Sequence, residues 1–571
     1  MYTLGINAAF HDSAACVVRD GKIVAAAEEE RFTRIKHGKR PIPFSTYELP
    51  FHAVAFCVKQ AGIKLRDVDH VAYSFDPYQL LGGRAGDAHI PIPLQSDGLT
   101  SPEWESPWDP LSLSAIVNAP RHLASGVPHH LQEHCSGLPD TGPERWHYVP
   151  HHLAHAASAF HASPYPRAAI MTLDGRGERA TTSYYIGSGQ QLTEHGAVTM
   201  PHSLGLLYEQ VTTHLGFLHS SDEYKVMALA SFGKPEYVDV LRRLVRVVGD
   251  GRYVIEPVNL HEWFGPPRAR GGPLEQRHYN LARSLQEILE ETTLQLVNWL
   301  HESTREEALC LAGGVALNCV LNARVRSQGP FKDVWVQPAA GDAGTALGAA
   351  LWVDAQVNPT AAMRASMEHV FWGPAYGDDE IEALLRRAKL SYRRLSNIPE
   401  ETAALLERDR ILGWFQGAME FGPRALGARS ILASPINASM QDRLNDIKDR
   451  EDFRPVAPVV LEEEAGNWFL DAKVSPFMLF VFDVMPDKAG RIPAVRHVDG
   501  TARLQTINRA QHPVYYDLLK AFHRRTGVPV LVNTSFNVRG EPIVCTPRDA
   551  VSAFFASPLD ALVIGSFLLE K

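Results

Sequence analysis

Two histidines and two aspartates are of the residue types that hold a metal ion. His151 and His155 are four residues apart, so on a helix both imidazoles would face the same side. Asp174 follows a strand-like apolar run, and Asp342 lies in a similar glycine-containing turn. Two imidazoles and two carboxylates favour Fe, Mn or Zn over Mg²⁺, which prefers oxygen ligands. Because the chain holds 25 histidines, capping or core histidines are the alternative interpretation of the pair.

Three glycine-containing turns accompany these candidate ligands. In chain order they contain Gly175, then Gly313 with Gly314, and then Gly344. Glycines at strand ends expose backbone N–H groups and let a nucleotide approach closely. One such turn would indicate little, but three together favour phosphate or nucleotide binding.

The last third of the chain is rich in arginine and carries further polar motifs. The candidate residues there are Arg424, Arg429, Lys448, Arg454, Arg503, Asn533 and Ser535. A guanidinium group can bind two oxygens of a phosphate at once, and a lysine adds a point charge. A surface ion pair would explain any single arginine, whereas four of them in three separate Pro/Gly-rich motifs favour an anion site.

Composition limits the class of protein. The chain has 571 residues, 45 % of them apolar, and 56 basic against 65 acidic residues give a charge of −9. Such a chain can bury enough apolar surface to fold. It lacks the basic excess expected of a nucleic-acid-binding protein, and no window is apolar enough to span a membrane. The six cysteines form no CxxC pair, which argues against zinc ribbons and disulfide scaffolds. We therefore expect a cytoplasmic protein without nucleic-acid or membrane partners.

Alternating strands and helices must position these residues, and that alternation predicts an α/β fold. We expect an early hairpin that turns at Asp20-Gly21, strands at 168–173 and 308–312, and a helix over 281–301. The pattern predicts two domains, 1–355 and 370–571. Within the first, residues 88–150 are crowded with Pro, Ser, Gly and His. We interpret this stretch as an irregular insertion that covers an acceptor site.

At these motifs the chain resembles a known family. Gly-Gly-Val-Ala-x-Asn at 313–318 and Gly-Asp-x-Gly at 341–344, behind the histidine pair, resemble the actin-like ATPase fold. The likeness is to the metal-dependent lobe shared with tRNA-threonylcarbamoyl transferases. The motifs at 419–433, 448–458 and 532–537 are similar to those of the NodU/CmcH family of O-carbamoyltransferases. The resemblance implies an actin-like first domain and a C-terminal YrdC-like α/β domain.

The resemblance also implies a two-step reaction. The C-terminal domain would form carbamoyl-adenylate from carbamoyl phosphate and ATP, which enters with Mg²⁺. The first domain would hold the adenylate and transfer the carbamoyl group to a hydroxyl of a secondary metabolite, such as an aminoglycoside antibiotic. AMP would leave. A metal ion, with Fe preferred and Mn or Zn as alternatives, would stabilise developing charge.

Each candidate residue receives a role from this resemblance. Lys448 and Ser535 are expected to be catalytic, and so is His11, which matches the position of a base that activates the acceptor. The expected ligands of carbamoyl phosphate and ATP are Arg424, Arg429, Arg454, Arg503 and Asn533. The expected adenylate-binding residues are Asp12, Gly175, Lys225, Gly313, Gly314 and Asn318. The expected metal ligands are His151, His155, Asp174 and Asp342.

Three other functions share some of these features. A tRNA-threonylcarbamoyl transferase shares the first domain, but the net charge and the Arg-rich C-terminal domain argue against it. A hydrogenase-maturation carbamoyltransferase normally carries zinc fingers, which this chain lacks. A nucleotide-binding scaffold or sensor would bind ATP without needing carbamoyl phosphate. The sequence does not identify the acceptor and leaves a homodimer open.

Overall fold

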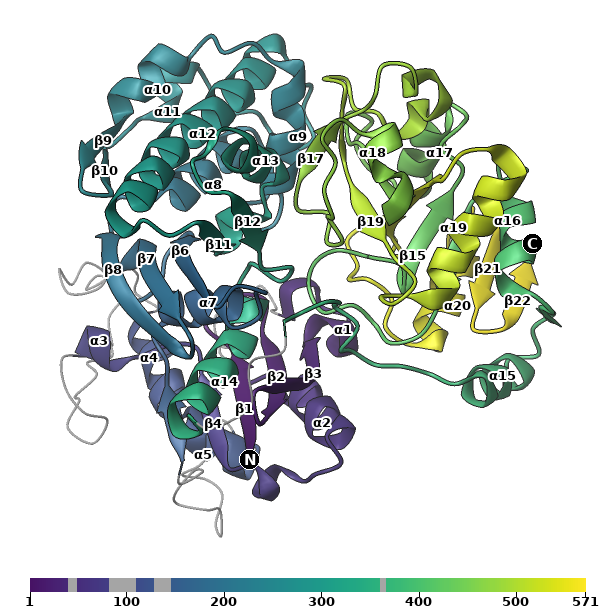
Figure 1. Cartoon of the computed structure of the whole chain (residues 1–571), viewed down its shortest axis with the longest axis horizontal. Helices are drawn as coiled ribbons and strands as arrows, with labels where there is room; N and C mark the ends of the chain where they lie inside the picture. The colour runs from purple at the N-terminus through teal and green to yellow at the C-terminus, as the bar shows by residue number, and fades with distance from the viewer. Residues whose placement is uncertain (39–48, 82–108, 128–144, 360–365) are drawn as a thin grey trace. The chain divides into compact units, whose positions relative to one another are not determined.

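The computed structural model describes residues 1–38, 49–81, 109–127, 145–359 and 366–571 (Figure 1). They form two compact units. Unit 1 comprises Met1–Ser203, Ala308–Val315 and Ala339–Met367, and unit 2 comprises Leu204–Glu307, Ala316–Pro338 and Glu368–Lys571. The domain limits 1–355 and 370–571 stay a prediction, because a compact unit can combine separate stretches of the chain and need not coincide with a domain. No described helix is both long and apolar enough to cross a bilayer.

Unit 1 contains two sheets and the helices around them. Its strands are β1 (Tyr2–Asn7), β2 (Ala14–Arg19), β3 (Lys22–Glu28), β4 (His70–Tyr73), β5 (Trp146–Tyr148), β6 (Arg167–Leu173), β7 (Ala180–Ser188), β8 (Gln191–Thr199) and β11 (Ala308–Ala312). Its helices are α1 (Glu30–Thr33), α2 (Phe51–Gln60), α3 (Tyr78–Leu81), α4 (Asp109–Val117), α5 (Ala119–Ser125), α7 (His151–Phe160) and α14 (Ala343–Val357).

The two sheets of unit 1 repeat one topology. In the first, the order is β3-β2-β1-β4-β5, with β1 antiparallel to β2 and parallel to β4. In the second, β8, β7, β6 and β11 follow the same order, with β6 antiparallel to β7 and parallel to β11. A hairpin pair followed by a parallel crossover strand, present twice, is the topology of an actin-like lobe. The predicted mixed α/β class and actin-like fold are confirmed.

Two helices lie between these sheets. α14 packs on β1, β2 and β4 of the first sheet, α7 packs on β6, β7 and β11 of the second, and the two helices pack against each other (Figure 1). Their crossing is close, since a Cβ on Gly348 would lie 1.8 Å from the Ala154 carbonyl oxygen. This layering fixes α7, which carries both candidate histidines, against the sheet whose strand β6 ends beside Asp174.

The described part of the predicted insertion is more regular than expected. Residues 88–108 and 128–144 lie outside the described residues, but α4 and α5 occupy most of 109–127. Leu113, Ile116 and Leu123 are buried in the core of the first sheet, at spacings that suit helices. Pro120 stands in the first turn of α5, where a proline is tolerated. The expectation of irregular structure was wrong for 109–125, because the abundance of proline concealed this apolar spacing.

Unit 2 contains a helical layer and a large sheet. The first part has α8 (Leu204–His214), α9 (Glu223–Leu229), α10 (Val238–Leu244), β9 (Val245–Gly249), β10 (Arg252–Ile255), α11 (Leu260–Phe264), α12 (Gln276–Thr304), α13 (Cys319–Gln328) and β12 (Asp333–Val336). The second part has α15 (Asp378–Arg387), β13 (Arg393–Arg394), α16 (Ile398–Leu406), β14 (Leu412–Phe415), β15 (Arg429–Ala433), α17 (Met440–Ile447), β16 (Ala457–Leu461), α18 (Ala465–Trp468), β17 (Val481–Asp483), β18 (Thr501–Arg503), β19 (Gln505–Ile507), α19 (Pro513–Thr526), β20 (Val530–Ser535), α20 (Pro547–Phe555), β21 (Ala561–Ile564) and β22 (Phe567–Glu570).

The large sheet of unit 2 is mixed. Its order is β13-β22-β21-β14-β15-β20-β16-β19, with α19 and α20 packed on it and α16 packed on α19 (Figure 1). The long helix α12 packs against α8, α9, α10 and α13. The predicted helix at 281–301 is confirmed within α12, and the predicted strands at 168–173 and 308–312 are β6 and β11. The YrdC-like character of the C-terminal domain stays a prediction.

Candidate functional site

Four predicted metal ligands converge in unit 1; we call His151, His155, Asp174 and Asp342 the His/Asp cluster. His151 Nε2 lies 3.4 Å from Asp174 Oδ2 and 3.5 Å from Asp342 Oδ1. His155 Nε2 lies 3.7 and 3.6 Å from the same two oxygens. All four residues are buried, and their ligand atoms lie within 4.8 Å of one another. The helix spacing and the two turns thus bring together the residues that the sequence singled out.

The cluster suits a metal ion. Its N–O separations are longer than those of typical hydrogen bonds, and His151 Nε2, His155 Nε2 and Asp342 Oδ1 are buried without a hydrogen-bond partner. Two ligand atoms that each lie about 2.1 Å from one ion at the tetrahedral angle are about 3.4 Å apart. The facing atoms therefore stand at the separation that a shared cation requires, and their donor set fits Fe, Mn or Zn.

Neighbouring groups orient these ligands. The Nδ1 of His151 lies 3.2 Å from the Ser74 carbonyl oxygen, so the lone pair of its Nε2 can face the cluster. The Gly314 N–H donates to Asp174 Oδ1 at 2.8 Å. Burial would lower the pKa of His151, but Asp342 and Asp174 hold it well above the usual value. Burial would raise the pKa values of both aspartates, and the neighbouring histidines keep them below the usual range. The site therefore favours ionised carboxylates.

His11 lies beside this cluster. Its Nε2 is 3.8 Å from Asp342 Oδ2, and its Nδ1 is 2.9 Å from Asp12 Oδ2. The second oxygen of Asp12 lies 2.7 Å from His37 Nδ1. Burial would raise the pKa of Asp12, but His37 and His11 hold it well below the usual value. The carboxylate of Asp12 thus fixes the His11 ring with its Nε2 toward the His/Asp cluster.

The glycine turns of unit 1 surround Asp174. Gly313 has φ +93°, and a Cβ there would lie 2.1 Å from the Leu173 carbonyl oxygen, so no other residue fits. The carbonyl of Gly175 accepts a hydrogen bond from Ser203 Oγ. Of the predicted adenylate-binding residues, Asp12, Gly175, Gly313 and Gly314 therefore belong to unit 1, whereas Lys225 and Asn318 belong to unit 2.

Unit 2 gathers five cationic side chains, which we call the cationic cluster: Arg424, Arg450, Arg454, Arg503 and Lys448. Burial, with a smaller contribution from Arg503, lowers the pKa of Arg424 to about 9. Burial, with a smaller contribution from Arg454, lowers the pKa of Arg450 to about 9. Burial, with Arg454 also contributing, lowers the pKa of Arg503. Buried nitrogens of Arg424, Arg450 and Arg503 have no hydrogen-bond partner. A bound anion would offset the repulsion among these like charges.

Lys448 lies beside the end of strand β20. Its Nζ donates to the Ser535 carbonyl, lies 3.0 Å from Ser535 Oγ and 2.7 Å from Asn537 Oδ1. Burial, with Arg450 and Arg454 contributing, holds the pKa of Lys448 well below its usual value. The predicted pair Lys448 and Ser535 is therefore brought into direct contact.

Arg429 and Asn533 lie differently from the prediction. The Arg429 guanidinium is fully buried, donates to the carbonyls of Pro374, Gln416, Gly417 and Ala428, and stands 3.6 Å above the Phe415 ring. Asn533 is also buried and donates to Ala425 and Gln505. Because these donors are bonded to oxygen atoms of the chain itself, the geometry favours a structural role, and the ligand-binding roles of Arg429 and Asn533 stay predictions.

Sequence reasoning missed two residues of the site. Arg450 stands between Lys448 and Arg454 in one of the polar motifs, and that position is the signal that could have found it. Tyr224 precedes Lys225, and its ring lies 4.7 Å below the Arg454 guanidinium. An aromatic ring under a guanidinium leaves no sequence signal, because the two residues are distant in the chain.

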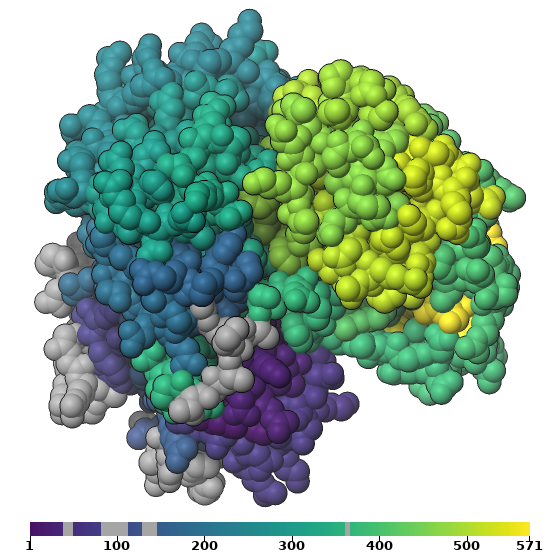
Figure 2. Space-filling view, in the orientation of Figure 1, coloured from purple at the N-terminus to yellow at the C-terminus, as the bar shows by residue number. Residues whose placement is uncertain are grey.

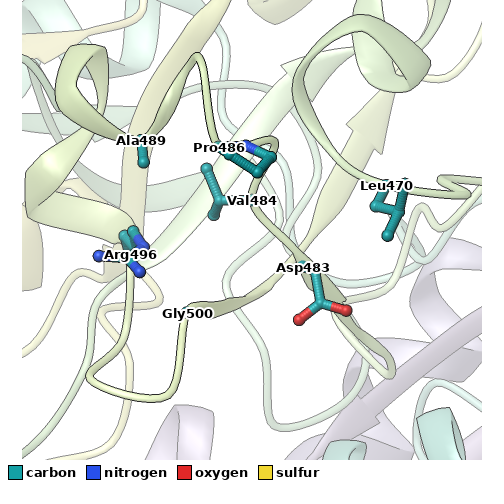
Figure 3. Close-up of a pocket in the computed structure, with 7 residues that line it drawn as sticks. All are labelled: Leu470, Asp483, Val484, Pro486, Ala489, Arg496 and Gly500. Carbon is teal, nitrogen blue, oxygen red and sulfur yellow. The ribbon is translucent and has the colours of Figure 1, made fainter.

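Unit 2 also has a pocket apart from the cationic cluster. It measures about 400 Å³ and is lined by Leu470, Asp483, Val484, Pro486, Ala489, Arg496 and Gly500 (Figure 3). The stretch that contains these residues is light green at the surface in Figure 2. None of them is a predicted site residue.

Comparison with known proteins places the chain in a family. The carbamoyltransferase N-terminus family matches residues 2–79 and 142–351, and the carbamoyltransferase C-terminus family matches 403–571. The chain therefore belongs to the carbamoyltransferase family, which makes it a transferase by class, and the predicted resemblance is confirmed.

Its relatives include nodulation proteins. Nodulation protein NolNO of Sinorhizobium fredii is 38 % identical over 99 % of this chain and 80 % of its own. Nodulation protein U of Bradyrhizobium diazoefficiens is 30 % identical over 93 % of this chain and 91 % of its own. An uncharacterised Synechocystis protein is 40 % identical over 100 % of this chain and 97 % of its own.

Two solved structures illustrate the structural likeness. Full-length HypF in its phosphate- and nucleotide-bound form is 14 % identical, with a TM-score of 0.34 over 63 % of this chain and 56 % of its own. Component A of (R)-2-hydroxyglutaryl-CoA dehydratase from Acidaminococcus fermentans is 11 % identical, with a TM-score of 0.31 over 62 % and 98 %. Similarities of this size leave the family assignment to the sequence.

Proposed function

We propose that this chain is an ATP-dependent O-carbamoyltransferase that passes a carbamoyl group from carbamoyl phosphate to an alcohol through carbamoyl-adenylate. The acceptor is a hydroxylated small molecule, for which an aminoglycoside is one candidate. The cytoplasmic location stays a prediction. The observation that carries the proposal is the cationic cluster, since its charge calls for phosphate-bearing substrates.

The first half-reaction fits the cationic cluster. Carbamoyl phosphate, ATP and one water would give carbamoyl-adenylate, phosphate and pyrophosphate. Arg424, Arg454 and Arg503, with the newly found Arg450, would bind the phosphate groups. Lys448, whose pKa is depressed by burial, would take up a proton as the phosphate charge arrives. Ser535 Oγ, 3.0 Å from Lys448 Nζ, is placed to donate to the same group.

The second half-reaction fits unit 1. His11 Nε2 would accept the proton of the acceptor hydroxyl while Asp12 holds the ring through Nδ1. His151, His155, Asp174 and Asp342 would hold a divalent ion, which when bound supplies Lewis-acid stabilisation of a phosphate or carbonyl oxygen. Gly313 and Gly314, at the end of β11, would present backbone toward the adenylate. AMP is then released.

The test separates the two steps. We expect AMP release from ATP only when carbamoyl phosphate is present, and a mass increment of one carbamoyl group on the acceptor. His11→Asn should leave adenylate formation intact and slow transfer about 10²- to 10⁴-fold, so that bound adenylate accumulates. His261→Asn, at an exposed histidine of α11, is the matched control. AMP release without carbamoyl phosphate would contradict the proposal, as would equal loss of both steps in His11→Asn.

A further inference from the structure

The cationic cluster has a carboxylate in contact with it, and the proposed reaction gives that group no role. Glu451 Oε2 lies 3.6 Å from Arg454 Nη1, and Glu451 Oε1 lies 2.9 Å from Lys225 Nζ. Among the described residues, no other carboxylate forms an ion pair with any of the five cations of the cluster. Glu451 is therefore the resident counter-ion of the cluster.

The two oxygens of Glu451 are held unequally. Oε1 accepts a hydrogen bond from Lys225, whereas Oε2 is buried without a hydrogen-bond partner. Burial would raise the pKa of Glu451, but Lys225 and, to a smaller extent, Arg454 hold it below the usual value, so the group is ionised. The contact with Arg454 is thus electrostatic and loose, while the contact with Lys225 is a short charge-assisted hydrogen bond.

Lys225 can receive the whole carboxylate. It lies near the start of α9, where Asp222 Oδ2 stands 3.2 Å from its Nζ, and the ammonium has three donors. Tyr224, the residue before it, packs its ring under Arg454 and keeps that guanidinium in place when the carboxylate leaves. One carboxylate also compensates only part of the charge of the cluster, whereas a phosphate dianion brings two charges and more oxygens.

We infer that Glu451 sets the affinity of the cationic cluster for phosphate: its carboxylate pairs with Arg454 in the absence of substrate, and incoming phosphate displaces it onto Lys225. This inference rests on the proposed anion site. Glu451 thereby weakens the affinity of the cluster for phosphate, and Lys225 offsets that weakening by drawing the carboxylate away.

The test is calorimetric titration of the full chain with inorganic phosphate at low ionic strength. Glu451→Gln keeps the shape of the side chain and removes its charge, so phosphate should bind about three- to tenfold more tightly. The matched control is Asp449→Asn, which removes a carboxylate two residues away that pairs with the exposed Arg539. It should change the affinity less than about twofold, because exposed charges are screened.

A double-mutant cycle tests the displacement. Lys225→Met should weaken phosphate binding about three- to tenfold in the wild-type background and less than about twofold in the Glu451→Gln background. Weaker binding in Glu451→Gln would mean that the carboxylate merely positions Arg454, and it would overturn the inference. A Lys225→Met effect that persists in Glu451→Gln would also overturn it. If the folded wild-type chain binds no phosphate, the proposed anion site itself fails, which is a different result.

Discussion

Arg429 and Arg454 lie in similar motifs, yet their replacement should have different effects: loss of Arg429 should lower stability, and loss of Arg454 should lower phosphate affinity. Arg429→Met keeps the apolar stem against Phe415 but removes the donors to four backbone carbonyls. At about 1 to 1.5 kcal/mol for each lost hydrogen bond, unit 2 loses about 4 to 6 kcal/mol. At about 2 °C per kcal/mol for a large unit, its Tm falls by about 8 to 12 °C. Arg454→Met removes a charge from a repelling cluster and should leave the Tm unchanged or slightly raised.

The assay pairs thermal unfolding with phosphate titration. Arg454→Met should keep the wild-type Tm and bind phosphate about tenfold or more weakly. Arg429→Met, in contrast, should show a lowered Tm as its main effect. A second variant, Arg429→Lys, restores one charge but cannot reach four carbonyls, so it should also lose stability. If Arg429→Met unfolds at the wild-type temperature and fails only to bind phosphate, then Arg429 is a ligand residue and our interpretation of its burial is wrong.

Three other predictions address the remaining parts of the site. Elemental analysis should find about one divalent ion per wild-type chain and under a tenth of that in Asp342→Asn, because a buried ligand is lost. Asp333→Asn, at an exposed residue of β12, is the control. Full occupancy in Asp342→Asn would contradict the metal site. Gly313→Ala should destabilise unit 1 far more than Gly189→Ala. A Cβ at Gly313 would lie 2.1 Å from the Leu173 carbonyl oxygen, whereas a Cβ at Gly189 would have no atom within 4 Å. Equal shifts in Tm would refute this prediction. Since burial and neighbouring arginines depress the pKa of Lys448 and a bound dianion would raise it, phosphate binding should take up a proton over the pH range in which Lys448 titrates. Calorimetry in two buffers measures this uptake, and Lys448→Met should abolish it.

The fold was largely predictable because its elements carry periodic signals. Asp20-Gly21, with positive φ at both residues, joins β2 to β3 as the dipeptide predicts. The apolar spacing of 281–301 predicts α12, although its ends extend beyond the pattern to Gln276 and Thr304. The helices at 109–125 escaped prediction, since their prolines and small residues conceal the apolar spacing.

The site was predictable where spacing or turn chemistry places a side chain. The four-residue interval puts His151 and His155 on one face of α7, and the turns place Asp174 and Asp342 beside them. Sequence could not distinguish Arg429, which faces inward, from Arg454, because both stand in polar Pro/Gly-rich motifs. Whether an arginine of such a motif is buried depends on tertiary packing, which the motif itself does not encode. The roles of these residues in binding and catalysis stay predictions.

The repeated topology of unit 1 has a consequence for how its chemistry is divided. The loop between β1 and β2 carries His11 and Asp12, and the loop between β6 and β7, at the matching place in the second sheet, carries Asp174. The two matching loops thus carry different functional groups: the imidazole of His11 in one and the carboxylate of Asp174 in the other. Each loop can vary while the opposite sheet keeps its own residues in place. A change in the loop after β1 therefore alters the surroundings of His11 and Asp12 and leaves Asp174, in the loop after β6, in place.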